Sequence, residues 1–347
     1  MNSMAALLVF IASAVITWIA GIWLTRVTDA IDAKFKLGSA FGGLLILGVI
    51  TSLTEAVVVI TASLNHNYDI VIGTVIGGVA IHTAFLALFD ARMKVDQPLT
   101  FAAASLTLVL EACMVIIVAV AAILAIRTPA VIQGTNFSLI SLLILVFWIF
   151  GLWLVYKSRN GLPWRAQAIA ANPGRGHHER RLVVNHPTFQ GASSLKITSV
   201  FILSSIATIG AGYGLAVTGG EVASTLGIGS GLFAATFIAF AGALPNISTG
   251  IESIKIGDYK LAMSDIFGAN AFMPALLIVA DILAGRAVIQ SASPADIWFA
   301  AMGALLTSVY IIGLIVRHNK QIFKMGYDSL IVLVLYVVGL VMLSVWK

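Results

Sequence analysis

Long apolar stretches separated by short polar segments run along the whole chain. A helix that crosses a hydrocarbon core of about 30 Å needs about 20 mostly apolar residues. Ten stretches meet this requirement and predict membrane-spanning helices: 4–25, 38–63, 70–89, 98–126, 136–156, 197–218, 228–254, 261–284, 296–316 and 328–346. The pattern therefore predicts an all-α integral membrane protein with ten transmembrane helices and a lipid bilayer as its main surrounding.

The composition excludes most other classes of protein. Hydrophobic residues make up 60% of the 347 residues and charged residues only 10%, whereas soluble domains carry about 25% charged residues. The single Cys113 cannot form an internal disulfide, and no Cys or His spacing indicates zinc. We expect no bound cofactor and, since neither HExxH nor GxSxG nor a catalytic Asp pair is present, no enzyme activity.

The basic residues report topology and give no indication of a nucleic-acid partner. Of the 20 Lys and Arg residues, 17 fall in the odd-numbered connections between predicted spans; Arg127, Arg286 and Lys347 fall on the other side. The positive-inside rule therefore places both termini outside the cytoplasm, in a cell inner (plasma) membrane. The longest connection, 157–196, is predicted to be a basic cytoplasmic linker containing His177, His178 and His186.

The two halves of the chain are related by an internal repeat. At one ungapped offset (229 − 38 = 191), Tyr68 pairs with Tyr259 and Asp90 with Asp281. An odd number of spans separates the copies, so they face opposite ways, as in the inverted repeats of many secondary transporters. We predict a five-helix repeat at 1–156 (α-repeat 1 about 38–90), the linker, and a second five-helix repeat at 197–347 (α-repeat 2 about 229–281).

The acidic residues within predicted spans, where a carboxylate costs about 2.5–3.5 kcal/mol, include Glu55, Glu111, Glu252 and Asp265. Thr51 and Ser52 precede Glu55 by four and three residues, which places their hydroxyls on its helix face. Gly48 is expected to allow a local break in that helix. No Lys or Arg within a span is available to pair with Glu55 or Asp265.

The repeat brings these acids into one predicted site. Glu55 is equivalent to Asn246, and Asp265 is equivalent to Thr74, so each half contributes one carboxylate and one neutral oxygen-bearing residue. Hard cations such as Ca²⁺ bind six to eight oxygens, with carboxylates balancing the charge. We therefore expect a mid-membrane cation site with charge −2, formed by Glu55, Asp265, Asn246, Thr74, Thr51 and Ser52.

Three further residues are open to more than one interpretation. Glu252, three residues before Lys255, is expected to form a boundary ion pair rather than to bind a cation. Glu111 either relays protons or hydrogen-bonds a neighbouring helix. His82 is either packed and hydrogen-bonded or takes part in proton coupling.

These residues form a pattern that resembles the α-repeats of the cation/Ca²⁺ exchanger superfamily, in particular the prokaryotic sodium/calcium exchangers. TSLTE at 51–55 and GTVIGG at 73–78, then ALPN at 243–246 and SDIFGAN at 264–270, correspond to its G-T-S-x-P-E and G-[ND]-x-x-G-S-N motifs. The motifs diverge: Thr54 replaces Pro, Gly78-Val79 replaces Ser-Asn, Gly242-Ala243 replaces Thr-Ser, and Asn246 replaces the second Glu. The resemblance implies alternating-access exchange of Ca²⁺ for Na⁺, K⁺ or H⁺.

Three functions are therefore compared. The first is a secondary antiporter that exchanges Ca²⁺ or a related cation for Na⁺ or H⁺, with these inorganic cations as substrates. The second is a monovalent cation/proton antiporter on the same fold. The third is a transport-inactive sensor or assembly subunit, which is disfavoured because buried carboxylates without a function would be lost from mid-membrane positions.

Overall fold

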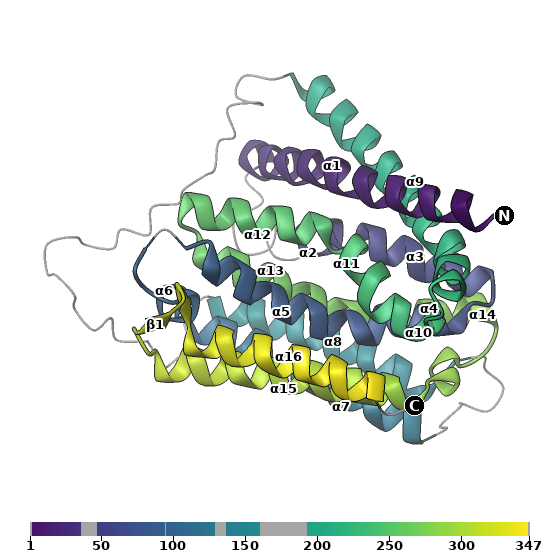
Figure 1. The fold of residues 1–347 in the computed structure, drawn as a ribbon. Helices are drawn as coiled ribbons and strands as arrows, with labels where there is room; N and C mark the ends of the chain where they lie inside the picture. Colours follow the sequence, from purple (N-terminus) through teal and green to yellow (C-terminus); the bar gives the residue numbers. More distant parts are fainter. Residues whose placement is uncertain (1, 36–46, 94, 129–136, 160–192, 346–347) are drawn as a thin grey trace, which may run out of the picture.

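The computed structural model describes residues 2–35, 47–93, 95–128, 137–159 and 193–345, nearly all of them helical (Figure 1). The first half of the chain contains α1 (Ser3–Phe35), α2 (Leu47–Thr51), α3 (Leu53–Leu64), α4 (Tyr68–Ile72), the π-helical turn η2 (Gly73–Gly77), α5 (Gly78–Ala91), α6 (Leu99–Ala103), α7 (Leu106–Arg127) and α8 (Leu139–Arg159). Most of the basic linker, including His177, His178 and His186, lies outside the described residues.

The second half of the chain is also mostly helical. It contains α9 (Ser194–Thr225), α10 (Ser230–Phe233), the π-helical turn η4 (Ala234–Ile238), α11 (Ala239–Gly242), α12 (Leu244–Ile256), α13 (Tyr259–Phe272), η5 (Met273–Leu276), α14 (Leu277–Ala284), η6 (Val288–Ser291), α15 (Pro294–Val316) and α16 (Tyr327–Val345). A short antiparallel hairpin, β1 (Gln321–Ile322) and β2 (Met325–Gly326), precedes α16.

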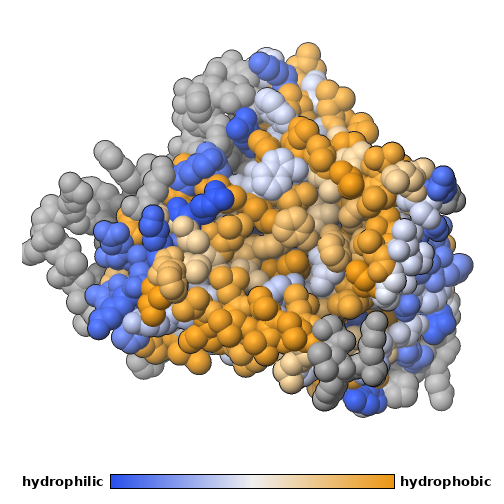
Figure 2. Space-filling view, in the orientation of Figure 1, coloured by the Kyte–Doolittle hydropathy of each residue, from blue (hydrophilic) through white to orange (hydrophobic). Residues whose placement is uncertain are grey.

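The chain is a multi-pass membrane protein. Seven described helices are long and apolar enough to cross a bilayer, and the pair Ser230–Gly242 and Leu244–Ile256, bent by 48°, forms an eighth candidate. Two shorter apolar helices, Leu53–Leu64 and Tyr327–Leu343, occupy the remaining two predicted stretches. Figure 2 shows hydrophobic side chains over the middle of the molecule and hydrophilic ones gathered at its two ends. The N- and C-termini lie at the same end (Figure 1).

The helices divide into a buried centre and a lipid-facing periphery. Residues 70–87 of the span Tyr68–Ala91 are all buried, whereas α8 exposes Phe147, Ile149, Phe150 and Trp153. The long helices α1 and α9 pack against each other at one edge of the molecule (Figure 1). Gly21 on α1 lies so close to α12 that a β-carbon there would meet Pro245 at 2.7 Å. The absence of that β-carbon allows the peripheral helix to pack directly over the broken central one.

Two helices break at positions that are 191 residues apart. The first break lies at Ser52, between α2 and α3, and the second at Ala243, between α11 and α12. Pro245 has no N–H to donate to the carbonyl four residues earlier, which accounts for the second break. The first break occurs with Thr54 at the equivalent position. It lies at Ser52 and not at Gly48, which the sequence had suggested, because Gly48 still accepts the helical hydrogen bond from the Ser52 amide (3.1 Å).

The equivalent residues Asp90 and Asp281 perform the same structural task. Asp90 accepts hydrogen bonds from the backbone N–H groups of Leu99 and Gly326, both at 2.7 Å. Asp281 accepts them from Val288 at 2.7 Å and Ser138 at 3.1 Å. Gly326 directly precedes α16, and Ser138 directly precedes α8, so each carboxylate holds the start of the last helix of the opposite half. We call this pair the reciprocal aspartates.

We predict that replacing either reciprocal aspartate by alanine destabilises the protein. Asp281→Ala removes the buried acceptor for two backbone N–H groups, and each unsatisfied donor costs about 1–3 kcal/mol. Unfolding of the purified protein in detergent, followed by denaturant titration, measures the loss. Asp90→Ala is expected to have a similar effect because its contacts are equivalent.

The matched control is Glu252→Gln. Glu252 forms an exposed ion pair with Lys255 at 3.1 Å, and exposed pairs contribute about 0–1 kcal/mol. Equal stability of the aspartate variants and this control would contradict a structural role for the reciprocal aspartates.

Candidate functional site

Three of the predicted site residues form one hydrogen-bonded group near the two helix breaks. The Thr51 hydroxyl donates to Asp265 Oδ1 at 3.2 Å, and the Asn246 amide donates to Thr51 Oγ1 at 3.2 Å. Thr51 ends α2, Asn246 lies in the first turn of α12, and Asp265 lies in the middle of α13. The structure therefore joins residues from both halves of the chain, as the repeat predicts.

Glu55 lies in the first turn of α3, is fully buried and faces His82. Its Oε1 is 3.7 Å from His82 Nε2. A β-carbon on Gly242 would lie 2.9 Å from Glu55 Cγ, so the missing side chain at this position makes room for the carboxylate. Glu55 is also close enough to Asp265 for the two charges to interact electrostatically.

The break at Ser52 gives Glu55 and Thr51 different contacts. The sequence predicted that both side chains share one helix face, but α2 ends at Thr51 and α3 begins at Leu53. As a result, Thr51 contacts Asp265 and Asn246, while Glu55 contacts His82 and Gly242. The kink spreads the oxygens of one segment over two sides of the site.

Several buried oxygens of the predicted ligands have no hydrogen-bond partner within the described part of the chain. They are both carboxylate oxygens of Glu55, Oδ2 of Asp265, Oδ1 of Asn246, Oγ of Ser52 and Oγ1 of Thr74. Buried polar atoms in folded proteins are almost always satisfied by protein, water or an ion. Carboxylate, amide and hydroxyl oxygens of this kind are the donors that a hard cation binds.

The charge of the site is not balanced by a basic side chain. Among the described residues, neither Glu55 nor Asp265 forms an ion pair with a lysine or arginine, and His82 is the only ion-pair partner of Glu55. The described residues contain no group of three His, Cys, Asp or Glu side chains placed to hold a metal. Cation binding here has to combine two carboxylates with neutral hydroxyl and amide oxygens.

Sequence reasoning placed Glu252 correctly and left the position of His82 open. Glu252 pairs with Lys255 at the protein surface, as predicted. His82 on α5 lies beside Glu55 on α3, and only the three-dimensional packing of the helices reveals the contact. The available signal was a lone histidine within a span, eight residues after Thr74.

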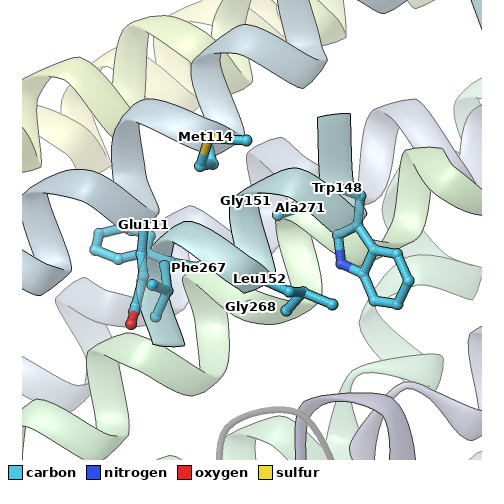
Figure 3. Close-up of a pocket in the computed structure, with 9 residues that line it drawn as sticks. Glu111, Met114, Trp148, Gly151, Leu152, Phe267, Gly268 and Ala271 are labelled. Atoms are coloured by element: carbon cyan, nitrogen blue, oxygen red, sulfur yellow. The ribbon is translucent and has the colours of Figure 1, made fainter. Parts of the chain in front are cut away.

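Glu111 makes the interhelical hydrogen bond that was one of its two predicted roles. Ser264 on α13 donates to Glu111 Oε2 on α7 at 2.7 Å. Beside it lies a cavity of about 40 Å³ between α7, α8 and α13, with Glu111 and Trp148 at opposite ends (Figure 3). Most of the lining is apolar, including Met114, Leu152 and Phe267. Glu111 thus fixes the helix that carries Asp265 through the adjacent residue.

Comparisons with known proteins agree on one family and one fold. The sequence profile described as "Sodium/calcium exchanger protein" matches residues 5–157 and 196–345. No curated protein matches the chain.

Two solved exchangers share the fold. The sodium-calcium exchanger NCX_Mj, soaked with 2.5 mM Na⁺ and 0.1 mM Sr²⁺, superposes with a TM-score of 0.59 at 17% identity, covering 98% of this chain and 99% of that chain. The H⁺/Ca²⁺ exchanger CAX superposes with a TM-score of 0.66 at 12% identity, covering 97% and 82%. At these low identities, the two superpositions show a common fold.

We predict that Gly242→Ala weakens cation binding at this site. The new β-carbon would displace the Glu55 carboxylate, and a loss of about 1.4 kcal/mol corresponds to a tenfold change in affinity. Binding is measured as the shift in thermal unfolding of the purified protein with increasing Ca²⁺. Gly210→Ala is the control, because a β-carbon at Gly210 meets nothing within 4 Å. Identical Ca²⁺ dependence in both variants would show that Glu55 does not require the space at Gly242.

Proposed function

Because the chain belongs to the sodium/calcium exchanger protein family, whose members are transporters and not enzymes, we propose that it is a secondary active antiporter. Its substrates would be Ca²⁺ or a related cation, exchanged for Na⁺ or H⁺ by alternating access. The observation that carries this proposal is the set of unsatisfied buried oxygens around Glu55 and Asp265. Thr51, Ser52, Thr74 and Asn246 would supply the neutral ligands.

Competition for two carboxylates supplies the coupling between the ions. One divalent cation, or two monovalent cations or protons, neutralises a charge of −2, and both loads cannot bind at full occupancy. An empty site would leave two charges in a low-dielectric environment, which is costly. Movement between the two access states is therefore favoured only when cargo is bound, so one ion is exchanged for the other.

The proposed topology has ten spans in two inverted repeats, 1–156 and 197–347, joined by a cytoplasmic linker at 157–196. It is supported by the position of both termini at one end of the molecule (Figure 1) and by the helix breaks 191 residues apart. With the charge bias of the connections, both termini would lie outside the cytoplasm, in a cell inner (plasma) membrane.

The second candidate is a monovalent cation/proton antiporter. It is favoured by one specific feature, the neutral Asn246 at the position equivalent to Glu55, which reduces the number of charged ligands. A site with fewer carboxylates binds a divalent ion less tightly and retains the capacity for Na⁺ or H⁺.

Transport assays with the protein reconstituted in liposomes distinguish these functions. A Na⁺ gradient and then a pH gradient are imposed separately while Ca²⁺ entry is followed. Ca²⁺ uptake driven by either gradient supports the antiporter and identifies its coupling ion. Na⁺-driven pH change without Ca²⁺ flux supports the second candidate. An absence of all fluxes, together with intact folding, supports a transport-inactive subunit.

We predict that Glu55→Gln and Asp265→Asn each abolish exchange while the protein still folds. Each variant is nearly isosteric but removes one of the two charges that the cargo neutralises. Flux in liposomes is compared with that of Glu252→Gln, whose carboxylate lies at the surface. Wild-type flux in both buried variants would exclude this site as the transport pathway.

A further inference from the structure

The peripheral helices α1 and α9 carry polar residues at equivalent positions. The offset of 191 residues that relates the two halves also pairs three positions of α1 with three of α9. In each helix these positions hold a serine, a threonine and a glycine at intervals of four residues, so they lie along one helix face. All six are buried: Ser13, Thr17 and Gly21 on α1, and Ser204, Thr208 and Gly212 on α9.

The glycine of this set brings α1 against the broken helix beside the site. A β-carbon on Gly21 would lie 2.7 Å from Pro245 Cγ, and the next residue of α12 is Asn246. α1 also contacts α11 and α2, and α2 ends at Thr51. The face of α1 that carries Thr17 therefore packs against the elements that form one side of the site.

The other half makes the equivalent contact. A β-carbon on Gly212 would lie 2.8 Å from the carbonyl oxygen of Thr54, which is the equivalent of Pro245 (245 − 191 = 54). The next residue of α3 is Glu55. Each peripheral helix thus contacts the residue that precedes a member of the candidate site, and each carries a buried threonine one turn before that contact.

Thr17 lies at the level of the helix break in the second half. It precedes Gly21 by four residues, which is about 6 Å along the helix. Figure 1 shows that α1 and α12 run in the same direction. One turn before the contact at Pro245 therefore corresponds to the break at Ala243, where the central helix is interrupted.

The hydroxyl of Thr17 differs from those of most buried threonines in this protein. A helical threonine commonly donates to the carbonyl four residues earlier, and five buried threonines do so at 2.7–3.0 Å: Thr83, Thr208, Thr218, Thr249 and Thr307. The Thr17 side chain has no solvent exposure, and its Oγ1 has no hydrogen-bond partner among the described residues. The other buried threonine hydroxyls in this state belong to Thr74 and to Thr54, which precedes Glu55.

A buried hydroxyl without a partner is unfavourable, and a bound ion is one of the groups that can complete it. Hydroxyl oxygens are neutral ligands that hard cations accept. We propose that Thr17 supplies, from the peripheral helix α1, a further oxygen ligand to the cation at this site. The inference rests on the proposed antiporter function and adds a ligand to that same site. The equivalent Thr208 is not available for this role, because its hydroxyl already donates to the Ser204 carbonyl at 2.8 Å.

Thermal unfolding of the purified protein in detergent tests the ligand without transport. Thr17→Val keeps the shape of the side chain but replaces the hydroxyl by a methyl group. In the absence of cation, this variant is expected to unfold at a higher temperature than the wild type, because it no longer buries an unpaired oxygen. The Ca²⁺ concentration that gives half of the maximal stabilisation should rise about tenfold. Thr17→Ser retains the hydroxyl and should keep the concentration of the wild type.

The internal repeat provides the matched control, Thr208→Val. Thr208 has the same helix position and the same burial as Thr17, but its hydroxyl is used by its own helix. This variant should leave the Ca²⁺ dependence unchanged, and the same comparison is made with Na⁺. A Ca²⁺ and Na⁺ dependence that is unchanged in Thr17→Val, or changed equally in both valine variants, would overturn the proposal.

Flux measurements separate this inference from the function on which it rests. In liposomes, Ca²⁺ entry driven by a Na⁺ or pH gradient should show a KM about tenfold higher in Thr17→Val than in the wild type, and Thr17→Ser should restore it. A wild-type KM in Thr17→Val overturns the inference alone. If the wild type shows neither flux nor stabilisation by Ca²⁺ or Na⁺, the antiporter function itself is overturned.

Discussion

A carboxylate buried away from water needs hydrogen bonds or an opposite charge to replace its lost hydration. The centre of this protein is organised around that requirement. Glu55 and Asp265 are buried within helices whose outer surfaces face lipid. Thr51 donates a hydrogen bond to Asp265 and accepts one from Asn246, but most of the remaining oxygens stay without a partner among the described residues. If the protein's own side chains satisfied every one of these oxygens, a bound cation would add little stabilisation. Cargo binding could then no longer favour one conformation of a transporter over another.

Some features of the scaffold recur at equivalent positions of the two halves, whereas the residues of the site differ between them. Helix breaks at Ser52 and Ala243 occupy equivalent positions, and they open the central helices where ligands are needed. The residues beside the breaks differ, with Glu55 opposed by the neutral Asn246. Gly242 has no side chain at the point where Glu55 packs. A shared backbone plan can therefore support different ion chemistries through a few substitutions at its centre.

The sequence predicted the helical class and the approximate positions of the helices, because lipid requires long apolar stretches. It also predicted that residues of both halves meet, since the equivalences Glu55–Asn246 and Thr74–Asp265 follow from a single offset. It missed the exact break at Ser52, where no proline marks the kink. It also left His82 unassigned, because a contact between two helices depends on their relative rotation, which periodicity does not encode.

The reciprocal aspartates have a consequence for how the two halves depend on each other. Asp90 of the first half secures the entry to α16, and Asp281 of the second half secures the entry to α8. In a half expressed alone, its reciprocal aspartate would lack the backbone N–H group that the other half donates. The last helix of that half would also lack the aspartate that holds its start. Two separate halves could recover these bonds only by assembling with each other, so each half of this chain depends on the other to hold its last helix in place.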